Sequence, residues 1–191
     1  MDPLFGIPVG LALSAAAGLR VFVPLLMTGV AARLGALPLT PCMAWIGSDV
    51  ALVSFGTATV VEVCAYYIPW LDNLLDAVAT PAAVTAGVML TAAATPELSP
   101  FLRWALAIVA GGGAAGFVQA TTALLRLKSS TFTAGAGNPL IATGELAGSV
   151  LLSLVGILAP LLGAVVVVAL LIFLANRFFR RRREGRRASP R

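Results

Sequence analysis

The sequence predicts an all-α membrane protein, and three observations lead to this fold class: its hydropathy, its scarcity of charge and the length of its apolar segments. Of the 191 residues, 59% are hydrophobic and 11% are charged, whereas about a quarter of the residues in a typical soluble domain are charged. The mean hydropathy is +0.97. A soluble core of this size cannot hide so much apolar surface, but a bilayer replaces water as its solvent.

Six apolar segments fit transmembrane helices, which need about 20 residues to cross the hydrocarbon core. They are 4–32, 50–71, 77–95, 101–125, 139–159 and 161–175. The first exceeds the required length, so we expect it to be tilted, kinked at Pro24 or broken near Gly18. The last two divide one long apolar run, and Pro160 marks the hinge between them.

The connections between the spans carry polar or turn-forming residues. A loop is expected over 33–49, a tight connection over 96–100 and a polar loop over 126–137. Four glycines of the fourth span should lie against another helix, because small residues let helices approach closely in lipid. They are Gly111, Gly112, Gly113 and Gly116.

Charge divides the chain into a transmembrane domain, 1–176, and a basic tail, 177–191, which holds eight arginines and a single glutamate. Cytoplasmic segments carry an excess of basic residues, so we place the tail in the cytoplasm, against anionic lipid rather than nucleic acid. Six spans return both termini to the same side, so both are expected in the cytoplasm. Twelve arginines against one lysine suggest a GC-rich bacterial genome and the bacterial inner membrane.

The transmembrane domain resembles itself in two halves, 4–95 and 101–176. The run SAAAG at 14–18 resembles GGAAG at 112–116, and the second span of each half carries one carboxylate. An odd number of spans per repeat inverts the second copy, which gives the inverted 3+3 repeat common among secondary transporters. The alternative is that small-residue runs recur by chance in a membrane protein rich in alanine and glycine.

The candidate site consists of Arg20, Glu62 and Glu145, charged residues that lie inside the apolar spans rather than at their ends. An ionised side chain at mid-bilayer costs at least about 2.5–3.5 kcal/mol on insertion scales, so the three should converge in the bundle interior. One interpretation is a substrate or ion site near the midplane. The other is a structural clamp between helices. One cation against two carboxylates leaves the cluster short of one positive charge, which a proton or a cation could supply.

Three further residues belong to the predicted solute- or ion-binding set. Asn138 follows a glycine-rich segment and precedes Pro139, so its helix start is either an anion site or an ordinary capped helix. Asp72 and Asp76 lie four residues apart near the cytoplasmic end of the second span. They form either a solvated rim or a funnel for cations.

Enzyme, metal and cofactor functions are not expected. The chain contains no histidine and two cysteines, which excludes the usual zinc ligand sets. It has neither a nucleophile elbow nor a phosphate-binding loop.

Three stretches carry a family resemblance: GLALSAAAGLRVFVPLL, VVEVCAYYIPWLD and GNPLIATGE. They resemble an uncharacterised bacterial family of small multi-pass membrane proteins, a domain of unknown function. The resemblance implies roles for Arg20, Glu62, Asp72 and Glu145, which match charged positions of the family pattern. The chain departs from that pattern at Tyr67, where the family often has lysine, and at Leu146, where it has aspartate.

We therefore expect a small transporter or channel, for a small anion or for a solute coupled to protons or cations. The alternative is a non-transporting scaffold or a lipid-binding or assembly protein, in which the Arg–Glu cluster is purely structural. Its partners would be the bilayer, a small solute or ion, and further copies of the chain in a homo-oligomer.

Overall fold

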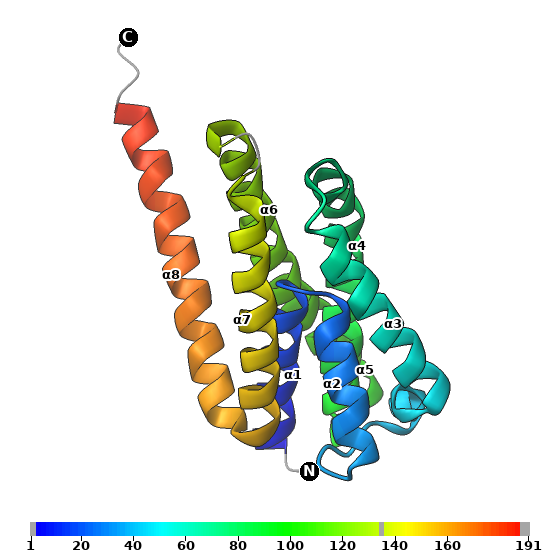
Figure 1. Cartoon of the computed structure of the whole chain (residues 1–191). Coiled ribbons are helices and arrows are strands. Elements are labelled where there is room, and N and C mark those ends of the chain that lie inside the picture. The colour runs from blue at the N-terminus through cyan, green and yellow to red at the C-terminus, as the bar shows by residue number, and fades with distance from the viewer. Residues whose placement is uncertain (1–2, 134–135, 188–191) are drawn as a thin grey trace.

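The computed structural model describes the backbone of residues 3–133 and 136–187 and the side chains of 5–68, 77–133 and 136–176, and within these ranges it is helical, without strands (Figure 1). The α-helices are α1 (Pro3–Ala17), α2 (Phe22–Arg33), α3 (Asp49–Ala65), α4 (Pro69–Ala94), α5 (Pro100–Leu106), α6 (Gly113–Thr133), α7 (Asn138–Leu158) and α8 (Pro160–Arg187). A 3₁₀ helix, η1 (Pro41–Gly47), lies within the loop expected before α3, and a π-helical segment, η2 (Ala107–Gly112), joins α5 to α6.

Apolar helices of membrane-spanning length establish a membrane-embedded protein. In the described part of the chain, three segments are long and apolar enough to cross a bilayer: Ala77–Ala94, Pro100–Thr133 and Asn138–Leu158. The pair Pro41–Gly47 and Asp49–Ala65, bent by 61°, makes a fourth if it is one span. The predicted number of six spans is therefore not confirmed.

The first predicted span is broken near Gly18, one of the three alternatives expected from the sequence, and its two halves form a hairpin. Figure 1 shows α1 and α2 side by side, joined at about half the height of the bundle, with their other ends at the same end of the molecule. Pro24 does not kink a continuous helix. It lies in the first turn of α2, where backbone N–H groups have no intrahelical acceptor and proline is tolerated.

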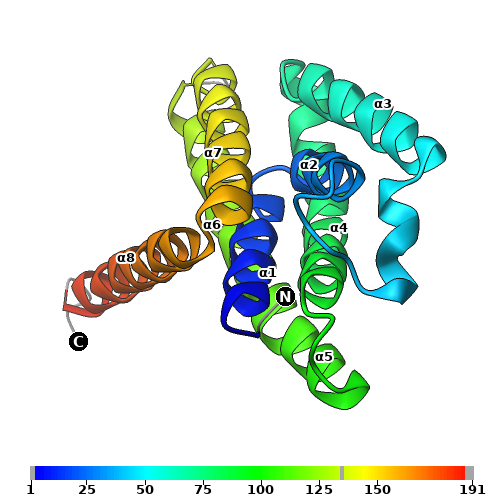
Figure 2. The same ribbon diagram turned by 90° about the horizontal axis from the view of Figure 1, so that it is seen from below.

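This hairpin changes the topology. Six full spans would place both termini on one side, whereas α1 begins at the end of the bundle opposite to the end of α8 (Figure 1). The chain runs along most of the height of the bundle in α4, the α5–α6 segment, α7 and α8, whereas α1 and α2 cover about half of it (Figure 1) and α3 lies obliquely (Figure 2).

Two other predicted boundaries are wrong. The segment 126–137 is not a loop over most of its length, because α6 continues to Thr133. Threonine hydroxyls in this segment donate to carbonyls one turn back, from Thr131 to Leu127 and from Thr133 to Ser129, so its polar residues are compatible with a helix. The second span ends at Ala65 rather than at residue 71, because Pro69 begins α4, a position that suits its missing N–H.

Small residues bring the central helices together. Seen from below, α1 lies between α4, α7 and α8 (Figure 2). A Cβ at Gly6 would lie 2.5 Å from the carbonyl oxygen of Ala94 on α4, and one at Gly156 would lie 2.6 Å from Ala12. Ser14 adds a hydrogen bond of 2.7 Å to the carbonyl oxygen of Gly87. Close packing of this kind replaces the hydrophobic effect, which is absent between helices in lipid.

The glycines of the fourth span behave as predicted, with one exception. A Cβ at Gly111 would lie 2.6 Å from the carbonyl oxygen of Gly87, and Cβ atoms at Gly112 and Gly116 would lie 3.0 Å from valines of α4. Gly113 is exposed and has nothing within 4 Å, so the prediction is wrong there. Gly113 lies about 100° around the helix from Gly112, which packs on α4, so it falls beside the contact face.

Candidate functional site

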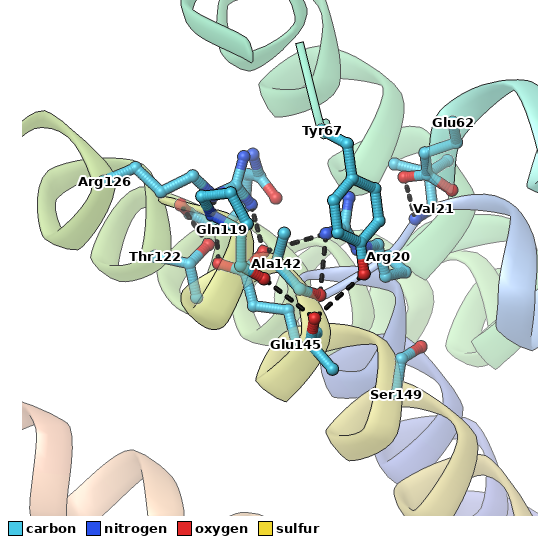
Figure 3. A network of polar contacts seen from close by, with 12 residues as sticks. Arg20, Val21, Glu62, Tyr67, Gln119, Thr122, Arg126, Ala142, Glu145 and Ser149 are labelled. Atoms are coloured by element: carbon cyan, nitrogen blue, oxygen red, sulfur yellow. Dashed lines mark hydrogen bonds and ion pairs between the residues drawn. The ribbon is translucent and has the colours of Figure 1, made fainter. Parts of the chain in front are cut away.

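The site is built around the turn of the α1–α2 hairpin, where the helical hydrogen bonds are interrupted in the middle of the bundle. Glu62 of α3 accepts hydrogen bonds from the backbone N–H groups of Val21 and Phe22, at 3.0 and 3.2 Å (Figure 3). Lipid offers no hydrogen-bond partners, so every backbone polar group at this depth needs a partner from the protein or from a polar cavity. One carboxylate thus satisfies two N–H groups at the start of α2, where the helix dipole favours negative charge.

The other side of the turn is supported by α7. Ser149 donates a hydrogen bond of 3.0 Å to the carbonyl oxygen of Ala16, near the end of α1. Arg20 is 2% exposed and its Nη2 donates to the carbonyl oxygen of Ala142, at 2.9 Å. The same Nη2 lies 3.5 Å from a carboxylate oxygen of Glu145.

Arg126 is the principal partner of Glu145, although the sequence predicted it at the start of a polar loop. Its Nε and Nη2 donate to the two carboxylate oxygens of Glu145, at 3.1 and 2.5 Å. Arg126 is fully buried and Glu145 is 5% exposed. This two-point geometry is the strong form of an arginine–carboxylate pair.

The Tyr66 ring joins the two arginines. The guanidinium carbons of Arg20 and Arg126 lie 3.9 and 4.2 Å from its centroid. Tyr66 is 3% exposed, so both cations rest on a buried ring, where cation–π attraction is stronger than at an exposed site. Beside it, Tyr67 reaches α7 through a hydrogen bond of 2.9 Å between its hydroxyl and that of Thr143.

The charge inventory differs from the expected one. The described side chains of the site include two guanidinium groups, Arg20 and Arg126, and two carboxylates, Glu62 and Glu145. The predicted deficit of one positive charge is therefore wrong for these four residues, because Arg126 was not counted. Figure 3 shows Arg20 between the two carboxylates, with Glu62 on one side and Glu145 on the other.

Several donors of the site have no acceptor within the described structure. They are Nε and Nη1 of Arg20 and the side-chain nitrogen Nε2 of Gln119, which is 1% exposed on α6. Gln119 lies beside Arg126 and faces Ala142 and Glu145 (Figure 3). Buried donors are almost always hydrogen-bonded, so three unmatched donors in one region mark a place for an acceptor.

The remaining predicted residues are separate from this cluster or outside the described side chains. Asn138 begins α7, is 2% exposed and donates from Nδ2 to the Ser130 hydroxyl of α6, at 2.9 Å. Its side chain therefore ties two helices together at this turn. The backbone places Asp72 and Asp76 one turn apart in α4, but their side chains lie outside the described residues.

The comparisons with known proteins identify a family whose function is unknown. The family model described as "Domain of unknown function (DUF4126)" matches residues 7–181. The chain belongs to this family. No curated protein and no solved structure matches it. The match includes most of the hairpin and every charged residue of the site, and it confirms the resemblance to an uncharacterised family.

Sequence reasoning missed Arg126, Gln119 and Tyr66. A signal for the first two was present, because Gln119, Thr122 and Arg126 are spaced by three and four residues and so lie on one face of a helix. All three are buried. Reading the segment as helix rather than loop would have placed Arg126 in the interior. For Tyr66 the sequence offered no comparable signal.

Proposed function

We propose that this protein is a small transporter or channel that binds an anion at the Arg20 site, near the middle of the bilayer. The observation that carries the proposal is the pair of unmatched donors on Arg20, in a side chain that is 2% exposed. A guanidinium is costly to bury, and nothing in a purely structural clamp requires it to keep two donors empty. Gln119 adds a third donor from α6.

The hairpin supports a transport role over catalysis. Interrupted helices at membrane depth are tolerated only where protein or a polar cavity satisfies the backbone, and transporters use such interruptions as binding sites. Here the interruption, the buried arginine and the start of α2 coincide. No cofactor and no metal enters this proposal.

The proposed topology has five crossings and one re-entrant hairpin, in place of six spans. The crossings are α3, α4, α5 to α6, α7 and α8, and the hairpin is α1 and α2. The Arg-rich tail lies in the cytoplasm of the bacterial inner membrane against anionic lipid, which puts the start of α1 on the outer side. An inverted repeat remains in the proposal as α2–α4 and α6–α8, whose helices run in opposite directions (Figure 1).

The alternative is a non-transporting scaffold, which one observation favours. Glu62 and Glu145 each have a structural task, the first at the start of α2 and the second with Arg126. In a scaffold, ordered water alone would occupy the unmatched donors of Arg20.

The experiment is anion flux from proteoliposomes loaded in turn with chloride, nitrate, sulfate or phosphate. We expect at least one of these anions to leave faster than from protein-free vesicles. Arg20→Lys should keep the fold but lose most of the flux, because lysine retains the charge and lacks the planar donor fork. Arg103→Lys on α5 is the matched control and should transport normally. Failure of the wild type to conduct any of the four anions would favour the scaffold.

A further inference from the structure

Glu62 occupies the strongest anion position of the hairpin. It accepts hydrogen bonds from the backbone N–H groups of Val21 and Phe22 at the start of α2, at 3.0 and 3.2 Å. The helix α2 is 12 residues long. The N-terminus of a helix carries the equivalent of about half a positive charge, and its free N–H groups point at whatever lies there. A carboxylate of the chain therefore fills the position that a small anion would otherwise take.

Arg20 offers anion-binding groups next to the same backbone. It directly precedes Val21, is 2% exposed, and its Nε and Nη1 lack an acceptor within the described structure. Glu62 makes no ion pair closer than 4 Å with Arg20 among the described contacts, although the two charges attract each other. The turn thus has two backbone donors, which bond to Glu62, and two side-chain donors on Arg20, which have no acceptor in the described structure.

We propose that anion binding at this turn is coupled to protonation of Glu62: one anion replaces the Glu62 carboxylate at the start of α2 as Glu62 takes up one proton. This inference rests on the proposed function, because it states how the same site is loaded. The proton comes from water and bonds to a carboxylate oxygen of Glu62, which gives up at least one backbone hydrogen bond. On release of the anion, the proton returns to water and Glu62 resumes its bonds.

The physical reason for the coupling is the electrostatic cost of adding a second negative charge to a buried site. An anion beside an ionised Glu62 would put two negative charges at one helix start, in an environment of low dielectric constant where like charges repel strongly. Exchange of an anion for a neutralised carboxylate leaves the net charge of the site unchanged, whatever other charges surround it. Anion and proton then cross together, and each transport cycle moves no net charge.

Glu62 suits this exchange better than Glu145. Glu145 accepts two hydrogen bonds from Arg126 and lies 3.5 Å from Arg20, so its protonation would remove the counter-charge of buried guanidinium groups. Glu62 is held by neutral N–H groups, and the described charges that face it are Arg20 and Arg126.

The elements packed against α3 add no other titratable group near Glu62 in the part of the chain with described side chains. On α2, Arg33 pairs with Asp49 at the far end of α3, and η1, which contains Cys42, directly precedes that same end in the chain. The described side chains of α4, 77–94, include no titratable residue, and those of 69–76 lie outside the description.

The test measures anion and proton movement together in proteoliposomes, with a trapped pH indicator and the fastest-moving monovalent anion of chloride and nitrate. Wild-type protein should move one proton with each anion in the same direction, and a potassium–valinomycin voltage clamp should not change the rate. Glu62→Gln should lose the proton movement, since glutamine resembles the protonated acid but cannot release a proton; the anion flux that remains should then move net charge and depend on the voltage clamp. Glu97→Gln, an exposed carboxylate in the 96–99 connection, should leave both movements intact.

The outcomes separate this inference from the proposed function. Anion flux by the wild type without proton movement, or proton coupling retained in Glu62→Gln, would overturn the coupling and leave the anion site standing. Absence of flux for all four anions, chloride, nitrate, sulfate and phosphate, would overturn the proposed function itself. If Glu62→Gln does not fold or carries no anion, proton uptake by the wild type in weakly buffered detergent decides: one proton per bound anion supports the coupling, and none refutes it.

Discussion

Replacement of Arg126 with methionine tests whether the buried pair with Glu145 stabilises the bundle. The change removes two hydrogen bonds, of 3.1 and 2.5 Å, from a carboxylate that is 5% exposed. Removal of one partner of a buried ion pair costs about 3–5 kcal/mol. Arg20 still lies 3.5 Å from Glu145 and offsets part of the loss. We therefore expect the lower end, about 3 kcal/mol, or on the order of a hundredfold in the folding equilibrium.

The assay is reversible unfolding in mixed detergent micelles, with Lys128→Met as the control. Lys128 lies on the same helix, two residues away, and is exposed, so its replacement should change stability by less than about 0.5 kcal/mol. A double-mutant cycle with Glu145→Gln isolates the pair from other effects of either change. Equal stability of the Arg126 and Lys128 variants, or additive effects in the cycle, would refute the assignment of Arg126 to a stabilising pair.

Three further predictions concern packing, the hairpin and topology. Gly111→Ala should destabilise the folded protein by about 1–3 kcal/mol, because the added Cβ would lie 2.4 Å from the Thr91 hydroxyl. Gly113→Ala should not destabilise it, since nothing lies within 4 Å of the added Cβ. Equal melting temperatures of the two variants would contradict this prediction. Ser149→Ala removes the hydrogen bond to the carbonyl oxygen of Ala16 and should cost about 0.6 kcal/mol in chemical unfolding; a loss several times larger would show that the hydroxyl has another task. Reporter fusions at the two termini should be active on opposite sides of the membrane, with the tail inside; activity of both on the cytoplasmic side would restore six spans.

The interior charges illustrate how far sequence reasoning reached. The cost of charge in lipid was sufficient to predict that Arg20 and Glu145 approach each other, and they lie 3.5 Å apart. It also predicted an interior position for Glu62 but not its task, since the N–H groups it binds are freed only by the break before α2. Arg126 was assigned to a loop because polar residues follow it. That assignment failed because hydroxyl groups can bond back to their own helix.

The sequence by itself determined that this protein lies in a lipid bilayer, that it is helical, and which of its side chains lipid cannot accommodate. These conclusions need no tertiary structure because hydropathy and charge are properties of the residues alone. Only the tertiary structure decided that the first apolar segment turns back at mid-height, since a 29-residue apolar run is equally compatible with a tilted span and with a hairpin. The choice depends on partners far along the chain: Glu62, which binds the N–H groups of the turn, and Ser149, which binds a carbonyl group. Contacts between residues 40 and 133 positions apart leave no local pattern, so only the assembled bundle reveals them.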